Sequence, residues 1–514
     1  MEPVDAQLIS SIAAGPPPPP ESPRRIGAPG VAWFFIMVLV LAIVGLRQLG
    51  PVLKPETGED VVGLLNMRMV GRYLVGAAAL GDESAQKMLY KQAEPLNTGT
   101  IPQRLQFVTL AGELGGPAEA LKHLRDLNEK LQSSADDAAE ENDGSRHKER
   151  PSSNGSPTAA QAEVIDVLGR LYGDYEQDEL TTPSVTPKER DLLRQELGWF
   201  GELALAPEGG PDAQQRQQVL LSAQVTMVGL VALFGGFLML ALGGFAGLIV
   251  CLVLWRQGQL RGGVLPATMR HGVYAETFAC WMALFLVLSG LAGFVGRSGG
   301  SLWLNLAAFF LSLAALGWPV LRGVPWQTVR QDIGWTHGRL RVAEPLMGLV
   351  CYAMAVPILL FGIIVTLMLI AFATQLGWLG GVQGEFDPTV APSHPVVNLV
   401  AEGGWLQWLQ ILLLASVAAP IVEETMFRGV LYAHLRGATQ KLGTAFSILA
   451  SALINGVLFA VIHPQGLLAV PALTAIAVGF SLTREWRGSL IPSMIAHGVH
   501  NGALMVLLIL FLAG

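Results

Sequence analysis

Three short groups of polar residues interrupt apolar stretches near the C-terminal end of the chain. The first is Glu423-Glu424-Thr425-Met426-Phe427-Arg428, the second runs from Phe459 to His463, and the third from His497 to Asn501. Carboxylates and imidazoles can move protons, and a carboxamide can donate hydrogen bonds to a developing oxyanion. Ionisable groups at bilayer depth cost about 2.5–3.5 kcal/mol each on insertion scales, so they are usually functional. These groups are the candidate site.

The first group combines a paired and an unpaired carboxylate. Residues four apart share a helix face, so Glu424 and Arg428 can form an ion pair that neutralises two charges in the membrane. Glu423 lies about 100° around the helix from Glu424 and lacks that partner. We therefore expect Glu423 to be the proton acceptor and Glu424 and Arg428 to have a structural role.

The histidines and the asparagine complete a possible hydrolytic site. His497 and Asn501 share a helix face and could donate hydrogen bonds to an oxyanion. His463 comes from a different stretch and could hold a water molecule against Glu423. At ~1.5 Å per residue, Glu423 lies roughly 21 Å before the intervening turn and His463 roughly 30 Å after it. Tilt or a longer turn would absorb this mismatch. Taken singly, these polar residues could also be interhelical packing contacts.

The composition indicates which kind of protein must position these residues. Of 514 residues, 51% are hydrophobic and 14% charged, and the mean hydropathy is +0.46. Soluble domains carry roughly 25% charged residues. A water-soluble enzyme and a disordered protein are therefore disfavoured, and the net charge of −7 offers no basic face for nucleic acid. Three cysteines in apolar runs indicate neither a disulfide framework nor a CxxC metal site.

We predict an all-α, polytopic helical membrane bundle with a helical extramembrane insertion. Residues 1–30 are expected to form a disordered Pro-rich tail, 31–49 an uncleaved first transmembrane helix, and 51–215 an acidic helical domain with a disordered linker at 133–161. Residues 225–321 are expected to form additional transmembrane helices, and 330–514 the core that holds the polar groups. About nine stretches approach the roughly 20 residues that cross a bilayer.

The charge distribution predicts an orientation. Residues 51–215 hold 16 Lys and Arg against 28 Asp and Glu, a net of −12, whereas the rest of the chain has 17 against 12, a net of +5. With a cytoplasmic N-terminus, the inside loops would carry eleven basic residues, and the outside loops after residue 255 would carry Arg297 alone. The positive-inside rule favours this arrangement. It would place the 51–215 domain outside the cytoplasm, and we expect a multi-pass protein of a bacterial cell membrane.

The three groups together resemble the CAAX-protease and bacteriocin-processing family of intramembrane proteases, known as CPBP or Abi. The family signature is E-E-x-x-x-R, then F-x-x-x-H, then H-x-x-x-N, and this chain has Glu423 to Arg428, Phe459 to His463 and His497 to Asn501. Gly429 and Pro492 also fit the family pattern. The resemblance covers about residues 330–514. It leaves the N-terminal part, with its acidic insertion, without an assigned purpose.

The resemblance implies an intramembrane endopeptidase that hydrolyses a peptide bond in or near the bilayer. Glu423 would activate the water, His463 would help to hold it, and His497 and Asn501 would stabilise the oxyanion, with Glu424, Arg428 and Phe459 as structural support. The family is often labelled metalloendopeptidase, and Glu423, His463 and His497 could bind Zn²⁺. A glutamate-activated water without metal is the other possibility.

The expected partners are the lipid bilayer and a membrane-anchored, prenylated or peptide substrate, with no nucleic acid. Because the insertion is acidic and faces outward, we expect a substrate other than a prenylated CAAX protein. Two other functions remain as alternatives. A proton-coupled transporter also uses membrane carboxylates and histidines, although internal repeats typical of transporters are not evident. A non-catalytic membrane scaffold or immunity protein would need the packing residue Arg428 but not the histidines.

Overall fold

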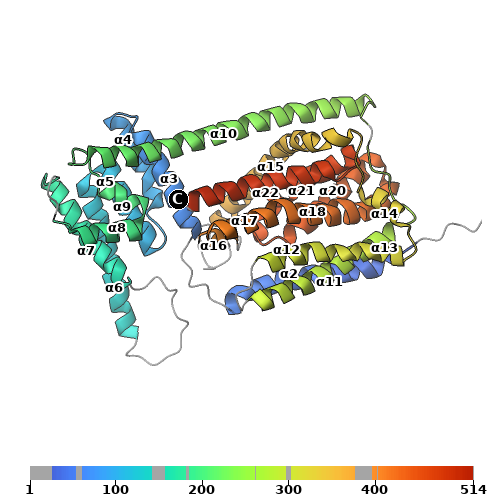
Figure 1. Ribbon diagram of the computed structural model, residues 1–514, viewed down its shortest axis with the longest axis horizontal. Helices are drawn as coiled ribbons and strands as arrows, with labels where there is room; N and C mark the ends of the chain where they lie inside the picture. Colours follow the sequence, from blue (N-terminus) through green and yellow to red (C-terminus); the bar gives the residue numbers. More distant parts are fainter. Residues whose placement is uncertain are drawn as a thin grey trace, which may run out of the picture.

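The computed structural model describes residues 26–53, 61–141, 157–180, 184–260, 262–296, 302–376, 396–401 and 403–512. Helices make up 84% of the structure, and no strand occurs within these ranges. Nine helices in the same ranges are long and apolar enough to cross a membrane. The predicted all-α polytopic bundle is therefore confirmed. Figure 1 shows the bundle with a group of shorter helices at one end.

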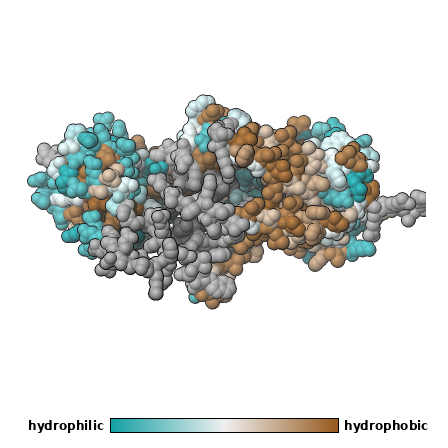
Figure 2. Space-filling model, turned by 90° about the horizontal axis from the view of Figure 1, so that it is seen from below, coloured by the Kyte–Doolittle hydropathy of each residue, from teal (hydrophilic) through white to brown (hydrophobic). Residues whose placement is uncertain are grey.

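The membrane-spanning helices coincide with the predicted apolar stretches, with short helices between them. In chain order they are α2 (Pro29–Leu53), α10 (Ala213–Arg256), α11 (His271–Gly296), α12 (Trp303–Ser312), η2 (Leu313–Leu316), α13 (Gly317–Leu321), α14 (Trp326–Ile333), η3 (Arg341–Ala343), α15 (Glu344–Gln375), α16 (Val396–Ala401), α17 (Trp405–Leu413), η4 (Leu414–Ala418), α18 (Ala419–Glu423), η5 (Glu424–Leu431), α19 (Tyr432–Thr439), η6 (Gln440–Leu442), α20 (Thr444–Val461), η7 (Leu467–Ala469), α21 (Val470–Arg487) and α22 (Ile491–Leu512). Large apolar side chains are exposed along these helices, and Figure 2 shows them as a hydrophobic band over the bundle.

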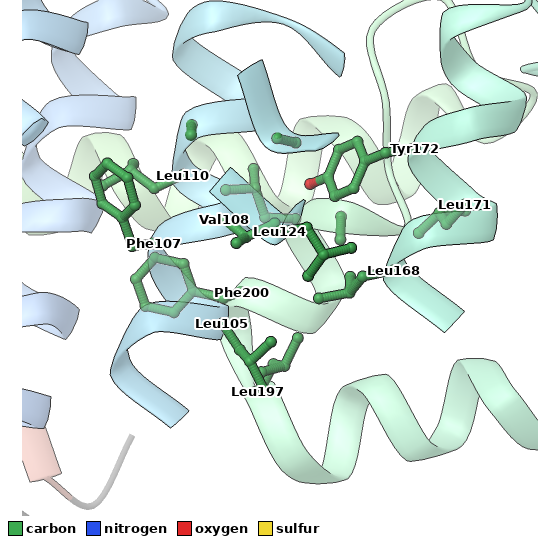
Figure 3. Close-up of a cluster of buried hydrophobic side chains, with 14 of the residues drawn as sticks. Leu105, Phe107, Val108, Leu110, Leu124, Leu168, Leu171, Tyr172, Leu197 and Phe200 are labelled. Carbon is green, nitrogen blue, oxygen red and sulfur yellow. The ribbon is translucent and has the colours of Figure 1, made fainter. Parts of the chain in front are cut away.

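The shorter helices form what we call the helical unit. It consists of α3 (Val61–Ala78), α4 (Glu83–Ala93), η1 (Glu94–Leu96), α5 (Ile101–Gly115), α6 (Pro117–Glu141), α7 (Ala159–Glu176), α8 (Pro187–Leu197) and α9 (Trp199–Ala204). Its core is apolar, and Figure 3 shows Phe107, Leu168 and Phe200 pointing into it from three helices. The unit therefore has a core of its own, separate from the bundle.

Two helices of the unit differ in extent from the sequence pattern. The periodicity of residues 104–131 suggests one helix, but the chain turns at Gly116, whose φ is +93°, and Pro117 starts a new helix. Helix α6 then continues to Glu141, into the segment predicted as a linker, because this stretch is rich in the good helix formers Ala and Glu. The rest of that linker up to residue 156 lies outside the described residues, as does the predicted tail up to residue 25.

Helix α10 joins the unit to the bundle. Asp212 caps its first turn by accepting a hydrogen bond from Gln215 N at 2.9 Å, and no proline interrupts the following 44 residues. At ~1.5 Å per residue the helix is about 66 Å long, roughly twice the hydrocarbon thickness of a bilayer. Its first turns pack in the core of the unit through Val219 and Ala223. A single helix therefore carries the chain out of the unit and across the bundle (Figure 1).

The opposite end of the bundle, which we call the basic end, is held by contacts between distant loops. Ile26 N donates to Met269 O and Leu490 N to Gly334 O, each at 3.0 Å, and Arg270 pairs with Asp332 at 3.1 Å. The basic residues predicted for the inside loops belong to this end, where they are Arg256, Arg270, Arg322, Arg330, Arg339, Arg341, Arg436, Lys441, Arg484 and Arg487. Arg261, Arg297 and residues 377–395 lie outside the described residues.

Candidate active site

Glu423 and Glu424 lie at a change of helix type in the middle of a membrane-spanning segment. Glu423 is the last residue of α18, and Glu424 begins η5, which is a π-helix. A π-helix frees backbone carbonyls from the usual ladder and is often found at functional sites. Asn455 of α20, fully buried, donates its amide to Phe427 O at 2.6 Å. The bond stabilises the unusual backbone next to the two carboxylates.

The turn between this segment and α20 brings the carboxylates and His463 to the same depth. The helical path does not end near Gly437 but continues through η6 to Leu442. Glu423 is 19 residues before Leu442, and His463 is 19 residues after Thr444, where α20 begins. Both distances are about 28 Å along a helix. The mismatch that the sequence suggests is therefore absent.

Glu424, Arg428 and His497 form a buried cluster. Arg428 Nη1 lies 3.0 Å from Glu424 Oε1, and neither side chain is exposed to any extent. His497 Nδ1 is 2.9 Å from the same carboxylate oxygen. The Arg428 guanidinium also lies over the Phe459 ring, 4.4 Å from its centroid, which is a cation–π contact. Glu424 thus pairs with Arg428 as the sequence predicts, and it also orients His497, which the sequence analysis did not foresee.

Glu423 faces two imidazole nitrogens across short gaps. Its Oε2 lies 3.9 Å from His463 Nε2 and 3.8 Å from His497 Nε2. These distances are too long for direct hydrogen bonds. They are the separations at which a bridging water can contact both groups. The Glu423 and His463 side chains are 17% and 18% exposed, so solvent or substrate can reach them.

In both histidines, the Nδ1 atom, which points away from Glu423, has a hydrogen-bond partner. His463 Nδ1 lies 2.6 Å from Phe459 O, and since a carbonyl only accepts, Nδ1 must carry the proton. His497 Nδ1 lies against the Glu424 carboxylate, which is paired with Arg428 and also accepts. In the neutral form of each ring, Nε2 is therefore an acceptor directed at Glu423. A hydrogen-bond partner at Nδ1 holds an imidazole in one tautomer and one orientation.

Asn501 lies one helical turn beyond His497 on α22 but has a different contact. Its Nδ2 donates to Ala415 O at 2.9 Å, in the π-helical segment η4. No hydrogen bond joins Asn501 to Glu423 in the described part of the chain. One N–H of the Asn501 amide remains available. The structure thus brings Glu423, His463 and His497 together, whereas Asn501 is hydrogen-bonded to η4.

The donor set of Glu423, His463 and His497 is of the kind that binds zinc, but its spacing is wide. At a tetrahedral zinc ion with bonds of about 2.0–2.1 Å, donor atoms lie about 3.3 Å apart. Here the oxygen is 3.8 and 3.9 Å from the two nitrogens. Among the described residues, no group of three or more His, Cys, Asp and Glu has an arrangement that could hold a metal ion. The observed geometry does not fit zinc.

The fold and the site define a polytopic membrane protein with a carboxylate and two imidazoles grouped between membrane helices. Residues 405–503 match the family described as type II CAAX prenyl endopeptidase Rce1-like. The match contains all three polar groups, and it confirms the predicted family for this part of the chain. These residues therefore form an Rce1-like domain, and the family of that domain is one of intramembrane endopeptidases. No curated protein and no solved structure matches the chain.

Proposed function

We propose that the chain is an intramembrane endopeptidase in which Glu423 activates a water molecule without a metal ion. The observation that supports this most strongly is the convergence of two Nδ1-protonated imidazoles on a single oxygen of Glu423, at 3.8 and 3.9 Å. A water at this point can donate hydrogen bonds to the Glu423 carboxylate and to His463 Nε2. Its oxygen is then directed at a peptide carbonyl.

The first step forms the tetrahedral intermediate. The water oxygen bonds to the carbonyl carbon, and the proton that it loses passes to Glu423. General-base catalysis of this kind contributes about 10²- to 10⁴-fold in rate. The carbonyl oxygen becomes an oxyanion, which accepts hydrogen bonds from the free N–H of Asn501 and from Nε2–H of His497, which enters the cycle with a proton on each ring nitrogen and keeps both throughout. The Glu424 carboxylate at Nδ1 balances the charge of His497.

The second step breaks the peptide bond. The oxyanion reforms the carbonyl, the C–N bond breaks, and Glu423 returns its proton to the leaving nitrogen. The products are a carboxylic acid and an amine, and Glu423 is again a carboxylate. Because the same group takes and returns the proton, the cycle needs no further acid.

The substrate is a polypeptide held at the membrane, and the bilayer is the medium that brings it to the site. The basic end of the bundle is cytoplasmic by the positive-inside rule, which places the helical unit outside the cytoplasm of a bacterial cell. A membrane-anchored precursor peptide fits this orientation better than a cytoplasmic prenylated protein.

The activity can be tested with two peptides and the purified full-length chain in liposomes. One is a farnesylated peptide with a CAAX end, and the other is an unprenylated single-span peptide with flanking extramembrane residues. We expect cleavage of the single-span peptide, with product masses that sum to the substrate plus one water. Hydrolysis of neither peptide, together with proton-driven uptake of a solute into the liposomes, would replace this proposal with the transporter alternative.

A further inference from the structure

The site lies at the inner tip of a helical hairpin that is shorter than its neighbours. Helices α20 and α21 have 18 residues each, about 27 Å, and the segment His463–Gly466 with η7 joins them. Helix α15 packs against α21. Its Gly362 lies beside Pro471 at the hairpin tip, since a Cβ added to Gly362 would be 2.7 Å from Pro471 O. It then continues to Gln375, about 20 Å farther. The tip of the hairpin therefore ends well inside the bundle.

On the side toward the basic end, the site is closed by tightly packed residues. All eight residues of η5 are buried, from Glu424 to Leu431. Helix α22 contributes Ser493 and Ala496, which have no exposed surface, and Arg484 of α21 is 2% exposed. Beyond them, Trp335 donates to Thr425 Oγ1 at 3.0 Å and closes the loop over the bundle. A polypeptide cannot reach Glu423 from the basic end without separating these helices.

On the side toward the helical unit, packing around the site is loose. Every residue of α22 from Gly498 to Phe511 is at least partly exposed, and so is each residue from Val461 to Thr474 around the hairpin tip. On the Glu423 helix, Val417, six residues before Glu423, is 45% exposed. On α22 and around the hairpin tip, the change from buried to partly exposed residues falls near His497 and His463, whereas Gln410, Ile411 and Ala418 on the Glu423 helix are buried. The accessible side of the site is thus the side that faces the helical unit.

The helical unit is fixed over this same end of the bundle. Leu65 of α3 packs in one cluster with Val400 of α16 and with Met505, Leu508 and Ile509 near the end of α22. Figure 1 shows α3 and α16 next to the C-terminal end of the chain. A polypeptide that approaches the site from this side therefore does so on the membrane face that carries the helical unit.

The hairpin tip also carries a polar group that lacks a partner. Gln465, two residues after His463, has a buried Oε1 that accepts no hydrogen bond in the structure. A buried acceptor without a donor costs free energy, and a bound group that supplies a donor would recover it. The backbone N–H groups of an extended peptide are donors of the right kind. Gln465 is close enough in sequence to His463 for one peptide to contact both.

We propose that the scissile segment of the substrate reaches Glu423 from the membrane face that carries the helical unit, passing the α20–α21 tip, where Gln465 Oε1 accepts a backbone hydrogen bond from it. The proposal rests on the proposed function, which it deepens by naming the substrate class. That class is a membrane-anchored polypeptide whose extramembrane part lies on the same face as the helical unit.

The direction of access can be measured without any substrate. Gln465→Cys is reconstituted in liposomes and treated with a charged, membrane-impermeant thiol reagent from either side. Lys122→Cys on the helical unit and Arg322→Cys at the basic end, with side chains 57% and 44% exposed, report which side is labelled. The unsubstituted chain, with Cys251, Cys280 and Cys351, gives the background. Leu349→Cys, 46% exposed on the side of α15, controls for thiols that face only lipid.

We expect Gln465→Cys to react only from the Lys122 side, and at least about tenfold faster than Leu349→Cys. Reaction from the Arg322 side, from both sides or from neither would overturn the proposed direction of access. Since this result does not depend on cleavage, it separates failure of the access proposal from failure of the peptidase mechanism.

The hydrogen bond from the substrate is tested by kinetics with the single-span peptide. Gln465→Leu removes the acceptor, and we expect the KM to rise about three- to tenfold with kcat unchanged. Thr474→Val is a matched control, because it removes a hydroxyl that is likewise buried without a partner, on the α20-facing side of α21. An unchanged KM for Gln465→Leu, or an equal rise for Thr474→Val, would contradict the role of Gln465.

Discussion

At the scale of single residues, the site separates two adjacent glutamates by their surroundings. Glu424 has Arg428 at 3.0 Å and His497 at 2.9 Å, whereas Glu423 has only imidazole nitrogens at 3.8 and 3.9 Å. A carboxylate that is already paired is a poor base. An unpaired one next to a reactive water is a good base. The two neighbours can therefore differ in role although they share one sequence motif.

The buried Glu424–Arg428 pair should be essential for stability. Glu424→Gln leaves the Arg428 charge without compensation inside the bundle, and we expect a loss of about 3–5 kcal/mol in the free energy of unfolding. Replacing both residues, with Glu424→Gln and Arg428→Met together, removes the uncompensated charge and should cost less. Thermal unfolding in detergent measures both. A double variant that is less stable than Glu424→Gln would contradict this account of the pair.

A chelator distinguishes the metal-free mechanism from a metallopeptidase. Because Glu423, His463 and His497 are spaced too widely for zinc, we expect a purified, active preparation to keep its cleavage rate after incubation with a tight chelator and removal of the complex. Loss of at least about tenfold in rate, restored by added Zn²⁺, would show that the side chains close around a metal ion.

The sequence indicates the main residues of the site but not how they are held. The four-residue spacings reveal the pairs, because side chains that share a helix face need no tertiary information. The contacts of His463 Nδ1 with Phe459 O and of Asn501 with Ala415 O depend on backbone carbonyls, which a sequence does not display. Asn455 was missed as well. An asparagine inside an apolar helix was the available signal.

At the scale of helices, close packing of α15 against α21 sets the position of the hairpin. Gly362 has no room for a side chain, because an added Cβ would lie 2.5 Å from Ala475 Cβ. The C-terminal half of α11 provides a contrast, since nothing lies within 4 Å of a Cβ at Gly290. Small residues that let helices approach are typical of membrane bundles.

Gly362→Val should therefore destabilise the bundle and displace the hairpin tip that carries His463. We expect a loss of about 1–3 kcal/mol in stability, the usual cost of overpacking, together with reduced cleavage. Gly290→Val is the matched control and should change neither. Equal thermal stability of the two variants, measured in the same detergent, would refute the packing argument.

In the helical unit, the cap of α8 should make the stability of this helix depend on pH. Glu189 accepts from Thr186 N at 2.7 Å in the capping box of α8 and pairs with Arg170. These hydrogen bonds lower the pKa of the Glu189 carboxyl to about 2. The bond from the Thr186 backbone is the largest cause, and the bond from Arg170 is the next. An unfolded glutamate has a pKa of about 4.3. The stabilisation is therefore fully present above about pH 4.5 and is lost as the pH falls toward 2.

Hydrogen exchange of the α8 amides measures this effect. At pH 7, Glu189→Gln should exchange faster than the unsubstituted chain, because it has lost the charged cap. At pH 2 most of the difference should be gone, since the Glu189 carboxyl is then protonated in about half of the folded molecules and in almost all unfolded ones. A difference of the same size at both pH values would show that the charge of Glu189 is not the cause. Glu196→Gln, near the C-terminal end of the same helix, is a control outside the cap.

Sequence patterns indicate the helices of the bundle. They are less informative about where a helix begins or ends, as at the start of α10 in the helical unit and at the break between α5 and α6. The apolar run from residue 225 to 255 indicates the membrane part of α10, yet the helix begins at Ala213, because the Gln-rich stretch 213–218 has helical propensity without an apolar run. The break at Gly116 was missed for the opposite reason. Apolar periodicity continues across it, while a positive φ value and Pro117 change the direction of the chain.

At the scale of the whole molecule, the helical unit and the site lie on one axis. The basic end of the bundle is closed by buried side chains, and the site lies behind them. The helical unit stands at the opposite end of the bundle (Figure 1). Long helix α10 connects the unit to the bundle without a break. This arrangement suits an enzyme that receives its substrate from the face of the membrane where the unit lies.

The most direct test of the central claim is the kcat of Glu423→Gln on the single-span peptide, in a preparation whose thermal unfolding matches that of the unsubstituted chain. Glutamine keeps the size of the side chain but cannot accept the proton, so we expect kcat to fall by about 10²- to 10⁴-fold. Glu202→Gln, in the helical unit, should leave it unchanged. A Glu423→Gln protein that cleaves the peptide within about twofold of the original rate would contradict the mechanism.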